Sequence, residues 1–487
     1  MRILGINCLN HDAAVSVIED GKILFAAHAE RYSRVKNDMY LNDTIMKEAF
    51  SYGEPDKIAY YERPWIKKSR QLYAGQYSEV FNKSNLPSNY LDPWLNGRKI
   101  NYIDHHLSHA AAGYYTSPYN EAAVLVIDGI GEWDVLTIWH GKGKNLKKIH
   151  SVKYPHSLGL FYSAATQNIG LKPCEEEYIL MGMSGWGKDK HWNQLKDDFF
   201  NPDELLKLNF NLHKGLGDYG KDYEQFDMAA STQTLTEHIL DRIVKYTKQL
   251  LPDVDNLVYM GGCALNCVAN GKILPKYYKK HWIMPNPGDA GSSLGAAAAV
   301  YGDHVEWSGA FLGTNIKGKY PVKSALKLLL KGEIIGIANG KAEFGPRALG
   351  NRSLLADPRG SKIKDKVNEI KRRQKFRPFA PAILEEYADE IFDMPIKRVP
   401  YMQYTAVCKQ PDKYPAICHV DNTSRVQTVS KKDNPGFYAL LKAFHAKTGC
   451  PMLLNTSLNI KGQPIVNTTA HALEFENHYS VKVLTHE

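Results

Sequence analysis

Two histidines set four residues apart, His105 and His109, have the best spacing in this sequence for binding a metal ion. They lie in the alanine-rich segment 104–115, whose composition predicts a helix. Residues four apart share one face of a helix, so both imidazoles would point the same way. Histidines that only pack or cap a helix can share this spacing, and His106 forms a second helical pair with His109. The segment therefore indicates a metal-binding pair but leaves its members open.

Two acidic residues favour the metal interpretation. Asp128 ends the apolar stretch VLVI, and Asp289 closes the loop NPGD just before a predicted helix. Two neutral imidazoles and two carboxylates form a borderline-hard ligand set, which suits Fe(II), Mn(II) or Zn(II) better than a soft metal. The sequence therefore predicts a divalent metal site made by His105, His109, Asp128 and Asp289.

Glycine-bearing loops precede two predicted helices and could offer backbone N–H groups to an anion. Gly261 and Gly262 follow a short apolar strand, and NPGD occupies the same place in the next strand-loop-helix unit. Free N–H groups and the helix dipole attract phosphate at such positions. The alternative is a simple tight turn, which glycine also favours.

A cationic loop occupies residues 340–359. Among its glycines and a proline stand Lys341, Arg347, Arg352 and Arg359. The guanidinium fork suits bidentate recognition of a phosphate or carboxylate, so we expect this loop to wrap an anion. For the basic helix predicted over residues 361–373, we expect the lysines to face solvent. Near the end of the chain a polar cluster follows an apolar strand, and a turn is its alternative interpretation: Asn455, Thr456, Ser457 and Asn459.

The elements that must position these residues begin with a short apolar strand at 2–6 and a hairpin over 13–30, turning at Asp20-Gly21. Residues 122–143 repeat this pattern as an apolar strand, a glycine-rich acidic turn at 128–131 and a returning strand. The repetition predicts an internal duplication.

Strand, glycine-bearing loop and helix then alternate, which predicts an α/β domain that binds ligands at the carboxyl edge of its sheet. We expect helices at 235–251, 264–274 and 290–300, and strands at 256–260 and 281–285. This alternation of strand, loop and helix stops between residues 303 and 330, so we place a domain boundary near 318. The predicted domains are residues 1–317 and a smaller α/β domain of residues 318–487, with strands at 333–340 and 453–458.

Composition limits the class of protein. The chain has 487 residues, of which 44% are hydrophobic, and a net charge of +9, which favours anionic small ligands. We find no recognisable nucleic-acid reader module and do not expect nucleic acid as a partner. Seven scattered cysteines fit reduced thiols. Without a signal peptide pattern or an apolar run of 18 or more residues, we expect a soluble cytoplasmic protein that does not engage membranes.

Ten motifs in order resemble the O-carbamoyltransferases that modify nodulation factors and antibiotics. They are HDAAV, HHLSHAA, VIDGIGE, SLGLFYSAAT, GGCALN, NPGDAGSSLGAA, GPRALGNRS, FRPFAPAIL, HVDNTSRVQTV and LLNTSLNIKGQPIV. The resemblance implies an N-terminal domain of the actin-like/sugar-kinase superfold (RNase H-like), similar to the metal-binding component of threonylcarbamoyl-tRNA synthesis. It implies a YrdC-like C-terminal domain. It further implies that the second domain makes carbamoyl adenylate from carbamoyl phosphate and ATP, and that the first passes the carbamoyl group to an acceptor hydroxyl.

The resemblance also implies roles for individual residues. Those expected to hold the carbamoyl and nucleotide phosphates are Lys341, Arg347, Arg352, Asn455 and Ser457, with Mg²⁺ accompanying ATP. Those expected to hold the adenylate in the first domain are Gly261, Gly262 and Asn266. The four predicted metal ligands match the ligands of the family. His11, in the turn before the first hairpin, is our candidate for the base that takes the acceptor proton, although a loop histidine can also be idle.

One position departs from the family pattern. Ile179, in EEYILMGMSGWG, stands where relatives commonly have a lysine. The contact made by that lysine is therefore missing or supplied elsewhere, and the acceptor pocket differs accordingly.

The acceptor is not named by the sequence. Candidates are a sugar, an antibiotic precursor or a hydroxymethylated nucleotide, and the basic charge balance favours the nucleotide. An alternative keeps both folds but modifies a tRNA adenosine in a threonylcarbamoyl-type reaction. Another alternative is an actin-like ATP-binding structural protein, against which the arginine-rich loop counts. The sequence leaves room for a homo-oligomer.

Overall fold

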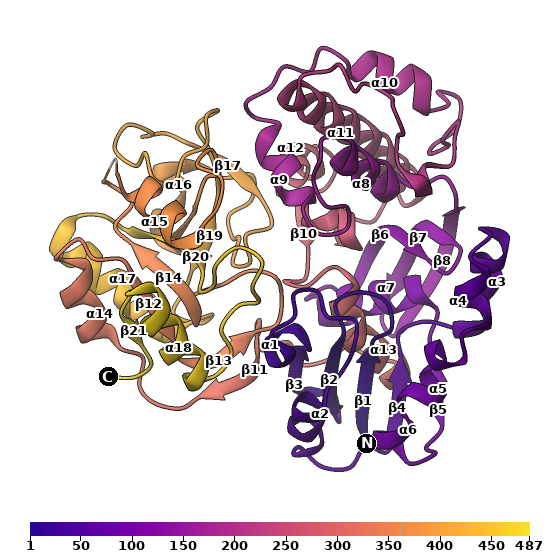
Figure 1. The fold of residues 1–487 in the computed structure, drawn as a ribbon, viewed down its shortest axis with the longest axis horizontal. Helices are drawn as coiled ribbons and strands as arrows, with labels where there is room; N and C mark the ends of the chain where they lie inside the picture. The colour runs from indigo at the N-terminus through magenta and orange to yellow at the C-terminus, as the bar shows by residue number, and fades with distance from the viewer. Residues whose placement is uncertain (361) are drawn as a thin grey trace.

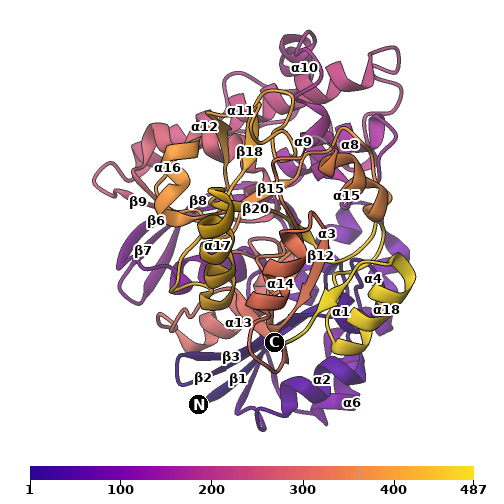
Figure 2. The same ribbon diagram turned by 90° about the vertical axis from the view of Figure 1, so that its left-hand side faces the viewer.

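The computed structural model describes residues 1–360 and 362–487 and shows a mixed α/β protein with several sheets (Figures 1 and 2). An N-terminal body contains two five-stranded sheets, and a C-terminal body contains a six-stranded and a three-stranded sheet. The two bodies touch, since Arg34 donates to the carbonyl oxygens of Pro464 and Ile465. In the described part of the chain, no helix is long and apolar enough to cross a membrane.

The first sheet begins with the predicted hairpin. Strands β1 (Arg2–Asn7), β2 (Ala14–Glu19) and β3 (Lys22–His28) form an antiparallel meander. The turn lies at Asp20-Gly21, where both residues have positive φ. Strands β4 (Lys57–Tyr60) and β5 (Ile100–Tyr102) then add in parallel, giving the order β3-β2-β1-β4-β5.

The second sheet repeats this plan. Strands β6 (Glu121–Gly131), β7 (Asp134–Lys142) and β8 (Asn145–Lys153) form the meander. Strands β9 (Asn256–Met260) and β10 (Lys280–Trp282) add in parallel beside β6. The order β10-β9-β6-β7-β8 matches that of the first sheet, so the predicted internal duplication is confirmed as a repeated topology.

Two helices rich in small residues, α7 (His105–Thr116) and α13 (Ser292–Tyr301), lie between the two sheets. Helix α13 packs on β1 and β2, helix α7 packs on β6 and β9, and the helices pack on each other. The approach is close enough that a Cβ on Gly295 would come within 1.8 Å of the Ser108 carbonyl oxygen. Both predicted helices are confirmed, and they occupy the rigid centre of the N-terminal body.

The other face of the second sheet is covered by helices α8 (Leu158–Asn168), α9 (Glu177–Met183), α11 (Gln225–Leu250) and α12 (Cys267–Tyr277). Helix α11 starts ten residues before the predicted 235, because Glu224 caps it by accepting a hydrogen bond from the Asp227 amide. The predicted helix 264–274 begins as a 3₁₀ turn, η3 (Gly262–Leu265), and α12 starts only after its cap, Asn266. The remaining N-terminal elements are α1 (Glu30–Ser33), α2 (Asp43–Phe50), α3 (Pro64–Tyr73), α4 (Tyr77–Phe81), η1 (Lys83–Asn85), α5 (Pro87–Tyr90), α6 (Asp92–Leu95), α10 (Trp192–Phe199), η2 (Leu212–Lys214) and η4 (Asp289–Gly291).

The C-terminal body is built on the sheet β19-β15-β20-β14-β12-β21. Its strands are β12 (Ile335–Ala338), β14 (Arg352–Ala356), β15 (Ala380–Leu384), β19 (Gln427–Val429), β20 (Met452–Ser457) and β21 (Val483–Leu484). A small sheet of β16 (Phe392–Asp393), β17 (Thr405–Cys408) and β18 (Thr423–Arg425) faces the N-terminal body. Strand β11 (Phe311–Ile316) pairs with β13 (Gly340–Glu343) across the predicted boundary at 318.

Helices cover this sheet. They are α14 (Val322–Leu329), α15 (Ile363–Lys371), η5 (Glu385–Tyr387), α16 (Ala388–Ile391), α17 (Pro435–Thr448) and α18 (Thr469–Tyr479). Helix α15 confirms the core of the basic helix predicted over 361–373, of which residue 361 lies outside the described residues. The expectation that its lysines face solvent is wrong for Lys371, which is buried because its ammonium donates to the carbonyl oxygens of Ser457 and Asn459.

Candidate active site: a buried His/Asp cluster and an arginine-lined cavity

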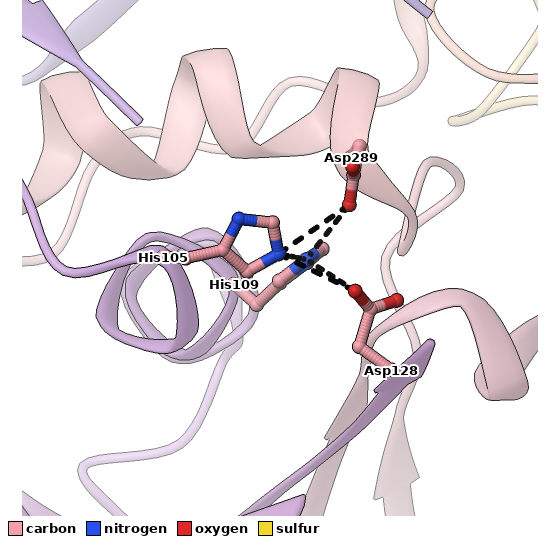
Figure 3. Close-up of side chains that lie close together, drawn as sticks. All are labelled: His105, His109, Asp128 and Asp289. Carbon is pink, nitrogen blue, oxygen red and sulfur yellow. Dashed lines mark hydrogen bonds and ion pairs between the residues drawn. The ribbon is translucent and has the colours of Figure 1, made fainter. Parts of the chain in front are cut away.

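The four predicted metal ligands meet at one point between the two sheets (Figure 3). One ligand atom from each residue lies within 4.8 Å of all the others, and all four side chains are buried. The Nε2 atoms of His105 and His109 are 3.2 Å apart. The Nε2 atom of His105 lies 3.3 Å from an Asp128 oxygen, and that of His109 lies 3.2 Å from an Asp289 oxygen.

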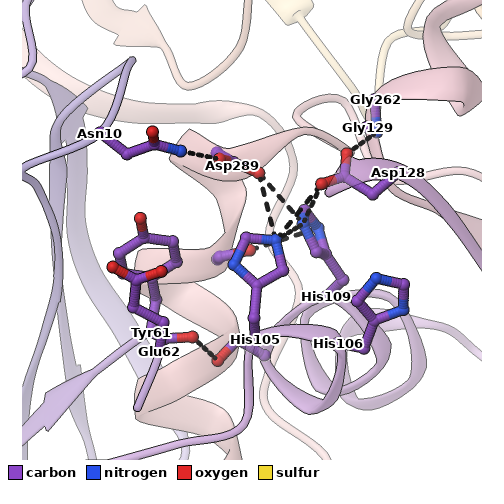
Figure 4. Close-up of polar contacts among 12 residues, drawn as sticks. Asn10, Tyr61, Glu62, His105, His106, His109, Asp128, Gly129, Gly262 and Asp289 are labelled. Carbon is purple, nitrogen blue, oxygen red and sulfur yellow. Dashed lines mark hydrogen bonds and ion pairs between the residues drawn. The ribbon is translucent and has the colours of Figure 1, made fainter. Parts of the chain in front are cut away.

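Local structure explains why these side chains meet. Helix α7 starts at His105 because Asp104 accepts a hydrogen bond from the Leu107 amide, so both histidines lie in its first two turns. Asp128 stands in β6 and Asp289 opens η4, which leads into α13. His106 points away from the cluster (Figure 4), and its Nδ1 atom contacts the Thr137 hydroxyl at 2.9 Å. Of the two pairs that the spacing left open, the structure therefore brings together His105 and His109.

Contacts around the cluster fit a bound cation. His109 Nδ1 lies 3.1 Å from the Pro287 carbonyl oxygen, which can only accept, so this nitrogen carries the proton and Nε2 presents its lone pair to the cluster. The Ser292 hydroxyl also contacts His109 Nδ1, at 3.2 Å. Asp128 is oriented by the Gly262 amide, which donates to it at 2.8 Å. Ligand types, convergence and supporting hydrogen bonds therefore suit a divalent metal ion.

The ionisation states of the cluster residues also fit a bound cation. Burial alone would raise the pKa of Asp128, but the hydrogen bond from His105 and the neighbouring His109 hold it well below its ordinary range. Burial and the Asp128 charge oppose ionisation of Asp289, yet His11 and His105 outweigh them and lower its pKa. Burial would lower the pKa of His105, but both carboxylates raise it to about 9. The two ionised carboxylates therefore hold positive charge at this point, as a metal site requires.

His11 lies at the edge of the cluster. Its Nε2 atom is 3.4 Å from an Asp289 oxygen and its Nδ1 atom is 3.0 Å from an Asp12 oxygen. Burial opposes the charged ring, but Asp289 and the bond to Asp12 raise the pKa of His11 to about 10. The side chain stays 43% exposed, and Asn10 beside it donates to Asp289 (Figure 4). Among the residues predicted for the transfer step, His11 is thus both near the cluster and accessible.

The glycine loop serves the cluster directly. Gly261 has φ +89°, and a Cβ there would lie 2.2 Å from the Ile127 carbonyl oxygen, so this position requires glycine, as the alternative of a tight turn expects. The Gly262 N–H is engaged by Asp128 and is not free for phosphate. Asn266 caps α12 and exchanges hydrogen bonds with Gln233.

A cavity of about 760 Å³ lies between the two bodies. Its N-terminal wall comes from α9, α11 and α12, and its C-terminal wall includes β17 and β18. Four guanidinium groups line the C-terminal wall: Arg347, Arg373, Arg377 and Arg425. Carboxylates also line the cavity, at Asp189, Glu237 and Asp421, but the guanidinium groups gathered on the C-terminal wall mark that wall as a site for an anion.

The arginines of this cavity repel one another. Burial lowers the pKa of all four, and neighbouring guanidinium groups lower it further for Arg347, Arg373 and Arg377. The combined effect brings the pKa of Arg347 to about 9. Arg377 stacks over the Tyr178 ring at 4.7 Å. Across residues 1–360 and 362–487, no carboxylate forms an ion pair with any of the four, so an anionic ligand would relieve their repulsion.

Of the residues predicted to hold phosphate, only Arg347 lines this cavity. The prediction for Arg352 does not fit the structure: its side chain is fully buried, and its guanidinium donates to the backbone carbonyl oxygens of Thr314, Asn339, Gly340, Asn351 and Asn467. No N–H of the guanidinium is left for a ligand, because these carbonyl oxygens accept from Nε, Nη1 and Nη2. Arg352 is therefore a structural residue.

The other predicted contacts also lie outside the cavity lining. Lys341 points at the Leu24 carbonyl oxygen of the N-terminal body, 3.5 Å away. Asn455 donates to the Ala348 carbonyl oxygen and so holds the residue next to Arg347. Ser457 accepts from the buried Lys371 ammonium at 3.2 Å. Arg359 binds Asp357 on the surface.

Residue types and spacing do not identify three of the cavity arginines, Arg373, Arg377 and Arg425, as ligand-binding residues. Arg373 is the last residue of the basic helix predicted over 361–373, and in the structure it stacks over Phe379 beside the cavity. Arg377 and Arg425 belong to the motifs FRPFAPAIL and HVDNTSRVQTV, and this was the available signal. Ile179, at the departing position, is buried in the core, while Tyr178 and Met181 on either side line the cavity.

Comparisons with known proteins match both bodies to the same family. Residues 95–298 match the model of the carbamoyltransferase N-terminus, and residues 326–487 match that of the carbamoyltransferase C-terminus. An uncharacterized protein of Synechocystis is 32% identical, with 96% of this chain and 93% of that protein covered. Nodulation protein NolNO of Sinorhizobium fredii is 30% identical, with 96% and 77% covered.

Two further proteins are more distant. The 3'-hydroxymethylcephem-O-carbamoyltransferase of Amycolatopsis lactamdurans is 27% identical, with 94% of this chain and 93% of that protein covered. Component A of (R)-2-hydroxyglutaryl-CoA dehydratase from Acidaminococcus fermentans overlaps 61% of this chain and 97% of its own, at 14% identity and a TM-score of 0.35, too low to support an argument. The two family matches and the relatives at 30% identity or more confirm the family predicted from the motifs: the chain belongs to the carbamoyltransferase family, enzymes that transfer a carbamoyl group.

Proposed function

We propose that this enzyme is an ATP-dependent O-carbamoyltransferase that works in two steps at two sites. In the first step carbamoyl phosphate, ATP and water give carbamoyl adenylate, pyrophosphate and phosphate. In the second step an acceptor hydroxyl attacks the carbamoyl carbon, the bond to the adenylate oxygen breaks, and AMP leaves. The observation that supports this division is that one chain combines a cavity of four arginines with a separate His/Asp cluster.

The arginine-lined cavity suits the first step. Carbamoyl phosphate and ATP both present phosphate groups, and Mg²⁺ accompanies ATP. The guanidinium groups of Arg347 and Arg425 both line the cavity and repel each other, so phosphate oxygens bound between them would stabilise both. Asn455 acts indirectly, because it holds Ala348 beside Arg347. We propose Lys341 and Ser457 as residues that support this site from outside its lining.

The His/Asp cluster suits the second step. His105, His109, Asp128 and Asp289 would hold Fe(II), Mn(II) or Zn(II), which supplies Lewis-acid polarisation when bound. His11 lies at the edge of the cluster and remains accessible. In its neutral form it would take the proton of the acceptor hydroxyl, and a cation held by Asp289 would favour that form by offsetting the carboxylate charge that raises the pKa of His11. The segment from Gly262 to Cys267 joins the two sites: Gly262 orients Asp128, Asn266 caps α12, and Cys267 lines the cavity. We propose that Gly261, Gly262 and Asn266 form the surface on which the adenylate lies, without a hydrogen bond from the Gly262 N–H, which Asp128 engages.

The acceptor is a small molecule with a hydroxyl group. The Amycolatopsis relative is named for a hydroxymethyl acceptor, and other relatives are named nodulation proteins. These names support the three candidate classes: a sugar, an antibiotic precursor and a hydroxymethylated nucleotide. Membership in the carbamoyltransferase family favours carbamoyl transfer over the threonylcarbamoyl-tRNA and actin-like structural interpretations.

We also propose the finer division of the fold. The repeated three-plus-two strand topology supports an actin-like/sugar-kinase fold for residues 1–317. The six-stranded mixed sheet supports a YrdC-like fold for residues 318–487. The seven free cysteines support a cytoplasmic location.

Two measurements test the proposal. Release of pyrophosphate from ATP should depend on carbamoyl phosphate, and mass spectrometry of a panel of hydroxylated acceptors should find one that gains a single carbamoyl group. Pyrophosphate release that does not respond to carbamoyl phosphate would contradict the first step. Carbamoyl transfer that persists in metal-free enzyme would contradict the second.

A further inference from the structure

A histidine of the C-terminal body reaches across the cavity to the N-terminal body. His419 is almost completely buried, and its Nε2 atom lies 2.9 Å from the Gly182 carbonyl oxygen at the end of α9. Both residues line the cavity. We propose that His419 is a positioning residue that latches the loop 182–187 onto the C-terminal wall and thereby seals the cavity between the two steps. The proposal rests on the two-step function above.

The loop is shaped to receive this imidazole. A Cβ on Gly185 would lie 2.3 Å from His419 Cε1 and 2.6 Å from its Nδ1, so only glycine leaves room for the ring. The next residue, Trp186, presents its indole to the same ring at 6.2 Å in an edge-on arrangement. The contact is therefore a fitted one, formed by side chains and backbone from both bodies.

The other side of the His419 ring contacts residues of the C-terminal wall, which bears the four arginines. His419 Nδ1 lies 3.5 Å from an Asp421 oxygen. Burial would raise the pKa of Asp421, but His419 and Thr423 lower it to about 2, so the carboxylate stays charged. The His419 amide also donates to the Thr423 carbonyl oxygen at 2.8 Å, at the start of β18, which ends at Arg425. The imidazole thus joins the strand that bears Arg425 to the α9 loop.

On the N-terminal wall of the cavity, helix α9 contacts the C-terminal body next to His419. Helix α9 contains Tyr178, whose ring stacks under Arg377, and it ends at the loop that His419 binds. Across this part of the cavity the contacts between the two bodies include the Arg377–Tyr178 cation–π contact, the His419–Gly182 hydrogen bond and the packing of Gly185 and Trp186 on the His419 ring. Loss of the hydrogen bond would let the loop and the arginine wall separate without removing any arginine.

Sealing matters because carbamoyl adenylate is a mixed anhydride. If it escapes, water attacks the carbamoyl carbon and breaks the bond to the phosphate oxygen, which gives AMP and carbamate, and carbamate decays to carbon dioxide and ammonia. Exclusion of water from a reactive intermediate is a recognised role of enclosed sites. A weakened latch should therefore appear as AMP formed without carbamoylated product, because the arginines of the first step remain in place.

The test compares carbamoylated acceptor with AMP in the same reaction of the full-length enzyme. For His419→Ala, carbamoylated product per AMP should fall about tenfold, as expected when one interdomain hydrogen bond is lost, and this ratio is read independently of the rate of pyrophosphate release. His419→Gln should recover most of the ratio, because its amide can donate to the Gly182 carbonyl. The control is His445→Ala, since His445 packs on Tyr387 within the C-terminal body. An unchanged ratio in His419→Ala would overturn the latch.

A second variant approaches the contact from the other body. Gly185→Ala places a methyl group where the ring lies and should reproduce the loss of product per AMP. Hydrogen exchange of residues 182–187 should accelerate in both variants and stay unchanged in His445→Ala. This readout needs no turnover, so it tests the latch even if wild-type enzyme makes no carbamoyl adenylate, an outcome that would refute the proposed function alone. Unaltered exchange in folded Gly185→Ala would also overturn the latch.

Discussion

The His/Asp cluster and the arginine-lined cavity solve opposite electrostatic problems. The cluster pairs two imidazoles with two carboxylates inside one body, where β6, α7 and η4 hold every ligand. The cavity gathers four guanidinium groups on its C-terminal wall, and the N-terminal body supplies the opposite wall. Mixed charges in a rigid centre suit a resident cation, whereas like charges at a junction are stabilised only when an anion arrives. The difference teaches that the first site is built by folding and the second is completed by its ligand.

The strongest test of this contrast is Arg347→Ala. Removing a buried guanidinium from the lining of the cavity proposed to bind phosphate should lower carbamoyl-phosphate-dependent pyrophosphate release by about a thousandfold. Transfer from supplied carbamoyl adenylate should continue, because the His/Asp cluster is untouched. The matched control is Arg359→Ala in the same basic segment, whose side chain binds Asp357 on the surface. Normal pyrophosphate release by Arg347→Ala would show that the first step occurs elsewhere.

Arg352→Ala should affect stability instead of ligand binding. This change leaves five backbone carbonyl groups without their buried donor, which should reduce the free energy of unfolding by about 3 kcal/mol. Urea denaturation followed by circular dichroism measures it. A variant as stable as wild type but unable to bind carbamoyl phosphate would restore Arg352 to the ligand site.

His109→Ala should weaken metal binding by about a hundredfold, since one of four ligands is lost. Elemental analysis after dialysis should then find little metal, and transfer from carbamoyl adenylate should fall with it. His106→Gln is the control, because His106 contacts Thr137 and faces away from the cluster. Full metal content in His109→Ala would remove this residue from the site.

The smallest expected effect is a pH dependence of metal affinity. In the metal-free protein the pKa of His105 is raised to about 9 by Asp289 and Asp128 against the effect of burial. A metal must displace that proton, so affinity should fall about tenfold for each pH unit below 9 and level off above it. Titration with Zn²⁺ between pH 7 and 9 measures the slope. A flat profile in this range would mean that His105 binds no proton that competes with the metal.

Local patterns were enough to predict the His/Asp cluster and the duplicated core. A helix places residues four apart on one face whatever surrounds it, so spacing makes His105 and His109 a candidate pair. The contact of His106 with Thr137 in the structure then decided between this pair and the pair of His106 with His109. The strand pattern of residues 13–30 and its repeat at 122–143 likewise reflect alternating and continuous apolar stretches. Asp128 and Asp289 were recognisable because each ends a strand-loop unit just where a helix or turn begins.

The cavity was decided by tertiary structure. Arg373, Arg377 and Arg425 come from separate segments, and only the packing of the C-terminal body against α9, α11 and α12 brings them around one space. The same packing distinguishes Arg347 from Arg352, five residues apart in one motif, because one guanidinium enters the cavity while the other is saturated by backbone carbonyls. Residue type and spacing determined which groups could bind a cation or an anion. Which of them have donors left for a ligand depended on burial and on hydrogen bonds between distant segments, and no short stretch of sequence encodes these.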